Sequence, residues 1–186
     1  MKFNEFAIPG VFEIIPDPHF DERGFFMRIL DVNLFNTYGV NRDWVQENHS
    51  RSEQKGIIRG LHFQFPPFSE TKLIRCISGA VLDVFVDLRK GSKTFGEWDS
   101  IELNDKNKKM ALIPRGFAHG FCTLTDVSEV IYKVDNYYSR ENEEGLIWND
   151  PDLNISWPVV HPILSQKDKN NLTFKKFIEK YNSINV

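Results

Sequence analysis

Short strand-like segments separated by turn residues run through most of this chain, and they limit what it can fold into. The clearest pair is Lys72–Ser78 and Ala80–Leu88, which flank Gly79 and predict a β-hairpin. The full set of predicted strands is Gly24–Leu30, Gly56–Phe65, Lys72–Ser78, Ala80–Leu88, Glu97–Leu103, Lys109–Ile113, Gly120–Thr125 and Val127–Val134. Such a series favours an all-β fold, an antiparallel barrel or jelly roll.

The end of the chain has a different pattern, because its apolar residues recur at a roughly helical spacing. These residues are Leu172, Phe174, Phe177, Ile178 and Tyr181. They predict a C-terminal amphipathic helix. The chain shows no linker, repeat or low-complexity tract, so we expect residues 1–186 to form a single domain.

Composition excludes several classes of partner. The net charge of -3 gives no electrostatic case for binding nucleic acid or an anionic membrane surface without specificity. No apolar stretch approaches the roughly 20 residues of a membrane span, and the N-terminus lacks the apolar core of a signal peptide. We therefore expect a cytoplasmic protein with no nucleic-acid or membrane partner. Cys76 and Cys122 lie in apolar strand-like runs and are predicted to be buried thiols.

Alternation along the predicted strands leaves two questions open. Asp83 and Asp87 share one face of their strand, and that face could meet either solvent or a polar cavity inside a barrel. In the strand that carries His62, simple alternation places Arg59 on the opposite face. If both of these side chains contact one ligand, Gly60 is expected to mark a bulge or bend.

Three residues on strand-like segments carry the groups needed to move protons beside a carbonyl. His62 offers a base, Lys72 a cation and Tyr132 a phenol. Each also has a structural interpretation, since a buried tyrosine usually packs and makes one hydrogen bond, and a lysine is usually solvated. The function of the three therefore depends on whether they share one pocket.

A metal-binding cupin is the main alternative for the two histidine motifs. Pro114–His119 fits the second cupin motif, PxGxxH. The first motif requires HxH, and the residue two positions after His62 is Gln64. Glu70 could supply a carboxylate, and two imidazoles with one carboxylate can bind a metal. The sequence favours the interpretation without a metal and leaves this one open.

Further motifs follow in order along nearly the whole chain. They are Asp21–Phe26 (DERGFF), Gln46–Ser52 (QENHSRS), Arg59–Gln64 (RGLHFQ), Lys72–Leu73, Asp83–Arg89 (DVFVDLR), Ser92–Gly96 (SKTFG), Pro114–Phe121 (PRGFAHGF), Tyr132–Val134, Tyr137–Tyr138 and Trp148–Pro151 (WNDP). Together they resemble the sugar-nucleotide 3,5-epimerase family, typified by dTDP-4-dehydrorhamnose 3,5-epimerase.

The resemblance implies a cupin-like jelly-roll homodimer that uses no metal or organic cofactor. The implied substrate is a nucleotide-diphosphate sugar with a 4-keto group, which acidifies the hydrogens on C3 and C5. His62 matches the family's base and Asp168 matches the carboxylate paired with it. Lys72 matches the residue that stabilises the enolate oxygen. Tyr132 matches the acid that returns a proton from the opposite face.

The resemblance also implies a set of substrate-binding residues. They are Arg23, Phe26, Gln46, Asn48, Arg59, His119, Tyr138, Glu143 and Lys167, with Phe26 and Tyr138 as aromatic contacts to the base. N-terminal segments cross to the partner subunit in this family, so Arg23 and Phe26 are expected to serve the neighbouring site.

Two residues depart from the family pattern, which commonly has Glu at Arg28 and Gln at Glu70. Both changes alter the charge of a ligand-binding wall. They leave open the nucleotide (dTDP or GDP), the sugar (hexose or heptose) and whether C3, C5 or both are inverted. A nucleotide-sugar 3,4-ketoisomerase and a sugar-binding cupin without turnover are the alternative functions.

Overall fold

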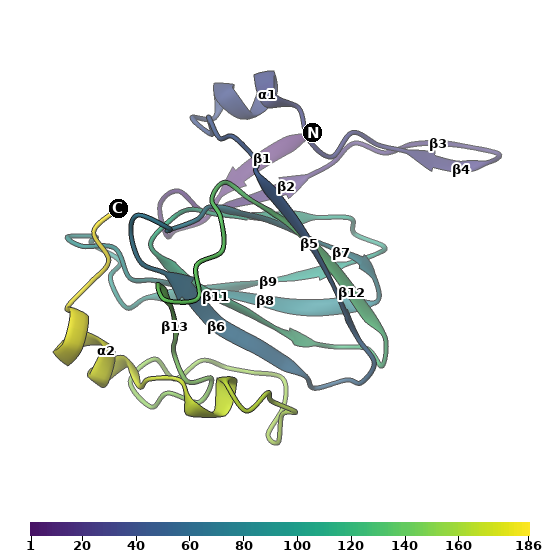
Figure 1. Ribbon diagram of the computed structural model, residues 1–186. Coiled ribbons are helices and arrows are strands. Elements are labelled where there is room, and N and C mark those ends of the chain that lie inside the picture. The colour runs from purple at the N-terminus through teal and green to yellow at the C-terminus, as the bar shows by residue number, and fades with distance from the viewer.

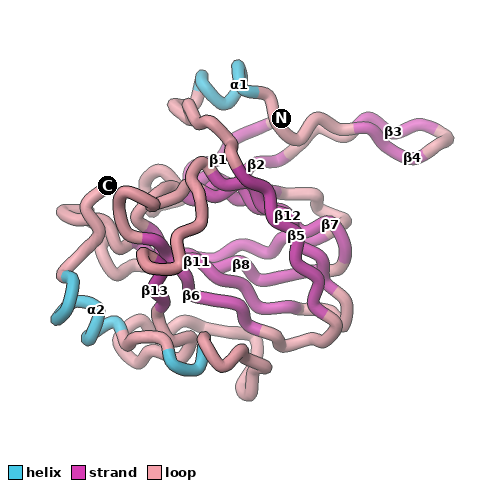
Figure 2. Tube along the Cα trace, in the orientation of Figure 1, coloured by secondary structure: helices cyan, strands magenta, loops and turns pink.

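Two antiparallel sheets face each other in the computed structural model, which describes residues 1–186 (Figure 1). In spatial order, the six-stranded sheet contains β1 (Lys2–Glu5), β2 (Phe12–Ile15), β10 (Met110–Ile113), β7 (Lys72–Ser78), β12 (Ser128–Val134) and β5 (Gln46–Ser52). The five-stranded sheet contains β13 (Glu143–Gly145), β6 (Ile58–Gln64), β11 (Phe117–Thr123), β8 (Ala80–Asp87) and β9 (Trp98–Asn104). Strands dominate the molecule, so the predicted all-β fold is confirmed (Figure 2).

The space between the sheets is divided into an apolar part and a polar part. Strand β7 shows this division along one face, because its alternate side chains point the same way. Ile74 and Cys76 join a core cluster with Phe85 and Phe121 of the facing sheet. Lys72, two residues before Ile74, lines a cavity instead. The apolar part therefore holds the sheets together and leaves the cavity free for chemistry.

The outer faces of both sheets are also covered. Val84 and Val86 of β8 pack in one cluster with Phe177 of helix α2 (Phe174–Tyr181). Leu73 of β7 packs on the other side with Phe35 of helix α1 (Val32–Thr37). A strand covered on both faces reads as almost continuously buried, which is the pattern along β8.

The carboxylates of β8 are therefore buried, and the solvent-facing interpretation of Asp83 and Asp87 is wrong. Both residues have 0% exposure. Asp83 pairs with His119, and Asp87 accepts hydrogen bonds from Arg89, Ser92 and Thr94. Asp87 thus fixes the loop after β8 by hydrogen bonds, while Asp83 orients His119 in the polar interior.

The strand prediction fails most clearly near the N-terminus. The strand predicted for Gly24–Leu30 ends at Phe26, because β3 (His19–Asp21) and β4 (Gly24–Phe26) form a separate two-stranded sheet. This hairpin projects away from the barrel (Figure 1). Strand β5 was also missed, since its polar sequence lacks the apolar signal of a buried strand.

The C-terminal helix is confirmed. Helix α2 begins after Thr173, whose side chain accepts a hydrogen bond from the Lys176 amide, and Phe177 is its fully buried anchor. A 3₁₀ turn, η1 (Asp168–Asn170), precedes it along the chain.

The expected irregularity at Gly60 is confirmed. The pairing of β6 with β11 shifts register between His119 and Phe121, opposite this glycine. Gly60 has φ +123°, and a Cβ there would lie 2.6 Å from the Cα of Gly120. Only glycine fits such a backbone contact without displacement. The irregularity lets Arg59 and His62 line the same cavity despite their odd spacing.

The two cysteines are free and buried, as predicted. Burial raises the pKa of the Cys76 and Cys122 thiols to about 11, which leaves both in the thiol form near neutral pH. None of the helices has both the length and the apolar character needed to cross a membrane.

Candidate active site

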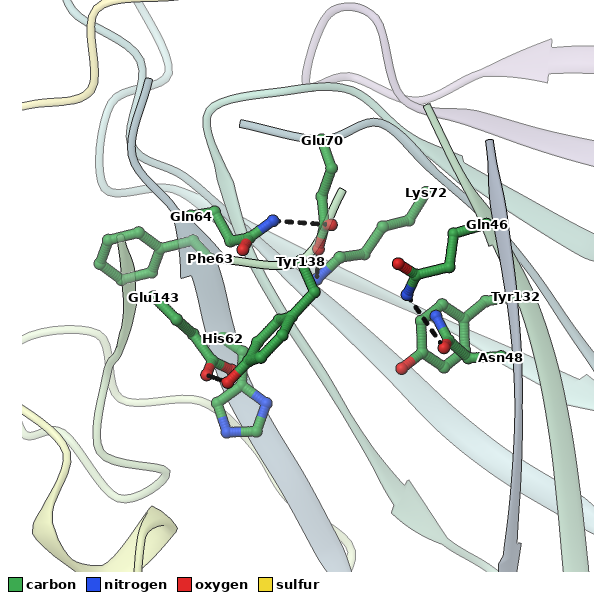
Figure 3. Close-up of a pocket in the computed structure, with 10 residues that line it drawn as sticks. All are labelled: Gln46, Asn48, His62, Phe63, Gln64, Glu70, Lys72, Tyr132, Tyr138 and Glu143. Atoms are coloured by element: carbon green, nitrogen blue, oxygen red, sulfur yellow. Dashed lines mark hydrogen bonds and ion pairs between the residues drawn. The ribbon is translucent and has the colours of Figure 1, made fainter. Parts of the chain in front are cut away.

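A polar cavity with two lobes opens between the sheets. The larger lobe has a volume of about 410 Å³, the smaller about 270 Å³, and both are lined by His62, Lys72 and Tyr132. The larger lobe is completed by Gln46, Asn48, Phe63, Gln64, Glu70, Tyr138 and Glu143 (Figure 3). The smaller lobe is completed by Ser50, Arg59, His119, Phe121, Ser165, Lys167 and Asp168. Most residues predicted for the site therefore surround one space.

His62 is held by a buried carboxylate. Its Nε2 lies 2.6 Å from Asp168 Oδ1, and Asp168 Oδ2 accepts a 2.8 Å hydrogen bond from Ser165 Oγ. Burial alone would raise the pKa of Asp168, but the hydrogen bonds from His62 and Ser165 hold that pKa below its ordinary value. An ionised carboxylate at Nε2 fixes the tautomer and leaves Nδ1 as the nitrogen that accepts a proton.

Tyr132 faces His62 across the cavity. His62 belongs to β6 of the five-stranded sheet, whereas Tyr132 belongs to β12 of the six-stranded sheet, and Figure 3 shows them on opposite sides. Burial raises the pKa of Tyr132, the carboxylates of Glu70 and Glu143 raise it further, and Arg59 opposes them. The phenol is therefore protonated at neutral pH and able to donate.

Lys72 brings a fixed positive charge to the region shared by the two lobes. It is the first residue of β7, and its side chain is 10% exposed. Its Nζ lies 3.2 Å from Glu70 Oε1. Gln64 Nε2 donates to Glu70 Oε2 at 2.9 Å, so the carboxylate has a partner on each oxygen. This arrangement compensates both buried charges.

A second group of polar residues lies at the Tyr138 end of the larger lobe. Tyr138 donates a 2.8 Å hydrogen bond to Glu143 Oε2, and Lys167 forms an ion pair with Glu143. Burial raises the pKa of Glu143, but the bonds from Lys167 and Tyr138 bring it below its ordinary value. On the edge strand β5, Gln46 Nε2 donates to Asn48 Oδ1 at 3.1 Å. These groups offer both donors and acceptors to a polar ligand.

The smaller lobe gathers the basic side chains of Arg59, Lys72 and Lys167 with the imidazoles of His62 and His119. Arg59 is oriented by Ser52 Oγ and by the Arg51 carbonyl, each 3.2 Å away. His119 Nε2 lies 2.8 Å from Asp83 Oδ2, so a buried carboxylate orients it as well. Anionic ligand groups such as phosphates suit a lobe of this kind.

Arg23 and Phe26 do not join the cavity within one chain. Both lie on the projecting hairpin, where Arg23 bonds its neighbour Asp21 and Phe26 is 73% exposed. Arg28, which departs from the family pattern, pairs with Asp31 in a separate hollow at the base of the hairpin.

Sequence reasoning missed several residues of the cavity wall. Ser50 is the clearest, because its Oγ is buried without a hydrogen-bond partner and lines the smaller lobe. It follows Gln46 and Asn48 at intervals of two along β5, so alternation would have found it once β5 was recognised as a strand. Gln64 and Glu70 were noted in the sequence, as part of a motif and as a departure from the family pattern, but neither was predicted as a site residue.

The geometry also bears on the metal-cupin alternative. His62 faces Asp168, His119 faces Asp83, and Glu70 faces Lys72. No group of three or more His, Cys, Asp or Glu side chains is arranged to hold a metal ion. The two histidines of the cavity are thus each committed to a carboxylate.

The fold is thus an antiparallel jelly roll whose cavity combines a His–Asp pair, a buried lysine and a facing tyrosine. Comparison with known proteins identifies the family. The model of the dTDP-4-dehydrorhamnose 3,5-epimerase family matches residues 5–176, and the chain belongs to that family.

Individual relatives agree with the family assignment. A dTDP-4-dehydrorhamnose 3,5-epimerase from Shigella flexneri is 48% identical over 168 residues, covering 90% of this chain and 92% of the relative. The crystal structure of the Bacillus anthracis enzyme with TDP and PPi bound has a TM-score of 0.91 and 45% identity, covering 93% of this chain and 99% of that one.

A third comparison adds a sugar. The 3,5-epimerase of Legionella pneumophila Philadelphia 1, in complex with dTDP-4-keto-L-rhamnose, has a TM-score of 0.92 and 36% identity. The match covers 100% of this chain and 98% of that one. The resemblance drawn from the sequence motifs is therefore confirmed at the level of family, enzyme class and fold.

Proposed function

We propose that the chain inverts C3 and C5 of a dTDP-linked 4-keto-6-deoxyhexose through enolate intermediates and without a cofactor. One observation carries the proposal. His62, paired with Asp168 at 2.6 Å, and Tyr132 lie on facing walls of one cavity that also contains Lys72. The TDP bound to the Bacillus anthracis relative and the dTDP sugar bound to the Legionella pneumophila relative support a dTDP sugar here.

The proposed chemistry begins with His62 as the general base. Its Nδ1 takes the proton from C3 or C5, and the electron pair moves to the C4 carbonyl oxygen to give an enolate. Asp168 stabilises the imidazolium that forms. The Lys72 ammonium donates to the enolate oxygen, where negative charge develops.

Tyr132 then donates the phenolic proton to the same carbon from the opposite side. The pair of electrons returns from the enolate, the ketone is restored, and the configuration is inverted. Solvent reprotonates Tyr132 and takes the proton from His62 before the next step. Inversion needs two walls in this way, because a single base would tend to return the proton to the face it left.

The remaining residues of the site are proposed to hold the nucleotide sugar. Arg59, His119 and Lys167 line the smaller lobe and suit the diphosphate. Gln46, Asn48 and Glu143 line the larger lobe, and Tyr138, 56% exposed beside them, is suited to stacking on the thymine.

The same proposal includes a homodimer in which the β3–β4 hairpin completes the neighbouring site. The hairpin exposes three phenylalanines, with Phe20 at 70%, Phe25 at 50% and Phe26 at 73%. So much aromatic surface on a projecting hairpin suits contact with a second surface. Arg23 at its tip would then reach the nucleotide bound by the partner.

The test is deuterium uptake from D2O into a panel of dTDP- and GDP-linked 4-keto hexoses and heptoses, followed by NMR and mass. The proposal predicts exchange at both C3 and C5 of the dTDP-hexose, with inverted product. Exchange at one carbon, or with a GDP-heptose alone, would replace it with a narrower or different epimerase. Movement of the ketone to C3 would identify a 3,4-ketoisomerase, and binding without exchange a sugar-binding cupin.

A further inference from the structure

Glu70 is a largely buried carboxylate in the cavity wall that the proposed proton transfers do not use. Its Oε1 lies 3.2 Å from Lys72 Nζ, and its Oε2 accepts a 2.9 Å hydrogen bond from Gln64 Nε2 (Figure 3). The side chains of Glu70 and Lys72 are only 14% and 10% exposed. A buried ion pair holds both partners in place, because separating it leaves a charge without compensation.

Gln64 extends this connection to the segment that carries Tyr138. Its Nε2 also lies 3.0 and 3.3 Å from the carbonyls of Phe68 and Tyr137, so its two hydrogens are shared among three acceptors. Its Oε1 accepts a 2.6 Å hydrogen bond from the Ser139 amide. Hydrogen bonds at both Nε2 and Oε1 therefore orient the Gln64 amide, and they connect it to the segment that carries Tyr138.

The backbone around Glu70 is bonded to the same segment. Asn136 Nδ2 donates to the carbonyls of Pro67 and Ser69, at 2.8 and 3.2 Å, and Ser69 Oγ donates to the Gln64 carbonyl at 2.9 Å. The loop before β7 and the loop after β12 thus form one hydrogen-bonded unit. A network of hydrogen bonds between two loops favours one arrangement of its members.

We propose that Glu70 is a positioning residue that sets the Lys72 ammonium and the Tyr138 segment together, acting through the Gln64 amide. This inference rests on the proposed function, in which Lys72 meets the sugar ketone and Tyr138 meets the thymine. One carboxylate then positions both the group that meets the sugar ketone and the segment that meets the thymine. Its loss disturbs nucleotide binding as well as chemistry, although the side-chain polar contacts of Glu70 are with Lys72 and Gln64.

The experiment compares variants by two readouts, the affinity for dTDP alone and the rate of deuterium exchange. Glu70→Ala is expected to weaken dTDP binding by about threefold or more and to slow exchange by about tenfold or more. Lys72→Ala is expected to slow exchange but to leave dTDP affinity within about twofold. That contrast separates an effect on both ends from an effect on the ammonium alone.

Two conservative variants and one control complete the set. Glu70→Gln can still accept from Gln64 through its amide oxygen, so its dTDP affinity is expected to stay within about twofold of wild type. Glu70→Asp keeps the charge but is too short to bridge both partners, so its dTDP affinity is expected to fall. Glu129→Gln removes a carboxylate from the outer face of β12, where it pairs with His49 and Arg51, and should change neither readout.

A third readout does not depend on the proposed function. The ¹³C ring resonances of Tyr138 in the ligand-free protein, assigned with Tyr138→Phe, are expected to shift in Glu70→Ala and Glu70→Asp but not in Glu129→Gln. Unchanged Tyr138 resonances, or unchanged dTDP affinity, in both Glu70→Ala and Glu70→Asp would overturn the proposal. A wild-type protein that neither binds dTDP nor exchanges deuterium would refute the proposed function instead, and the resonances would still decide the role of Glu70.

Discussion

Predicted functional residues are held by largely buried carboxylates in the cavity, but not on the β3–β4 hairpin. In the cavity, His62 and Lys72 are each held by a carboxylate from the same chain. On the hairpin, Arg23 is held only by its neighbour Asp21, and Phe26 is almost wholly exposed. The difference separates the residues that this chain gathers in one cavity from those that, under the proposed function, contact a partner subunit.

Two glycines show the same contrast in the backbone. Gly60 in the cavity wall and Gly24 in the hairpin have nearly equal φ values, +123° and +126°. A Cβ on Gly60 would collide with the backbone of His119 and Gly120, whereas a Cβ on Gly24 would meet no atom within 4 Å. Conformation is therefore equally demanding at both positions, and only the packing differs.

The largest effect is expected from His62→Ala. Removal of the general base should slow deuterium exchange by about 10³-fold or more, because no other imidazole is held against Asp168. The affinity for dTDP should change little, since His62 faces the sugar. The measurement is exchange at C3 and C5 alongside a dTDP titration; exchange near the wild-type rate would remove His62 as the base.

The hairpin can be tested by mixing two defective variants. If Arg23 serves the partner's site, a mixed dimer of His62→Ala and Arg23→Ala contains one intact site. After subunit exchange in an equal mixture, about a quarter of all sites would be intact. Activity at low substrate concentration should therefore exceed that of either variant alone. Activity no higher than the average of the two would assign Arg23 to its own subunit or to no site.

The glycine comparison gives the next effect. Gly60→Ala is expected to lower the free energy of unfolding by about 3 kcal/mol or more, because backbone strain and a backbone collision add. Gly24→Ala bears the strain alone and is expected to cost about 1 kcal/mol. Urea unfolding of both variants measures the difference. Equal losses would mean that the close approach of Gly60 to Gly120 adds nothing to the cost of the strained backbone.

The smallest effect concerns stability in acid. Burial raises the pKa of Asp87, but the bonds from Arg89, Ser92 and Thr94 bring it below its ordinary value. The folded state then binds fewer protons than the unfolded state, so stability should hold down to about pH 5 and fall below about pH 4.

Asp21 supplies the matched comparison for that acid transition. The hydrogen bonds from Arg23 also lower the pKa of Asp21, but this pair lies in solvent and is screened. Asp87→Asn should therefore flatten the loss of stability below about pH 4, while Asp21→Asn should leave it unchanged. The check is the midpoint of urea unfolding across the pH range. A flattening in the Asp21 variant alone would contradict the contrast.

The sequence predicted the apolar strands of the barrel better than the polar edge strand that borders the cavity. Strand β7 was placed with its observed bounds because the apolar residues Leu73, Ile74, Cys76 and Ile77 form a run that stops just before Gly79. Strand β5 escaped because an edge strand that turns Gln46, Asn48 and Ser50 toward a polar cavity has no apolar face to detect. The polar side chains that suit β5 to binding a ligand also remove the apolar alternation by which a strand is predicted.

The candidate site was predicted in the same uneven way. The motif around His62 even indicated the irregularity at Gly60, because Arg59 and His62 could share a ligand only if alternation failed. The partners of the site residues were less accessible. Glu70 and Gln64 are close in sequence, yet their bond to each other and to the Tyr138 segment depends on how two loops meet. Such contacts belong to tertiary structure and leave no periodic signal.

Tyr132→Phe tests the central claim, that protons leave toward one wall and arrive from the other. The variant should still lose the substrate proton to His62, so deuterium should enter C3 or C5 with the original configuration. Inversion should fall by about 10²-fold, because the phenolic proton donor of the facing sheet is gone. The decisive quantity is the ratio of exchange to inversion, followed by NMR in D2O. A ratio well above the wild-type value supports the two-wall account, and an unchanged ratio would contradict it.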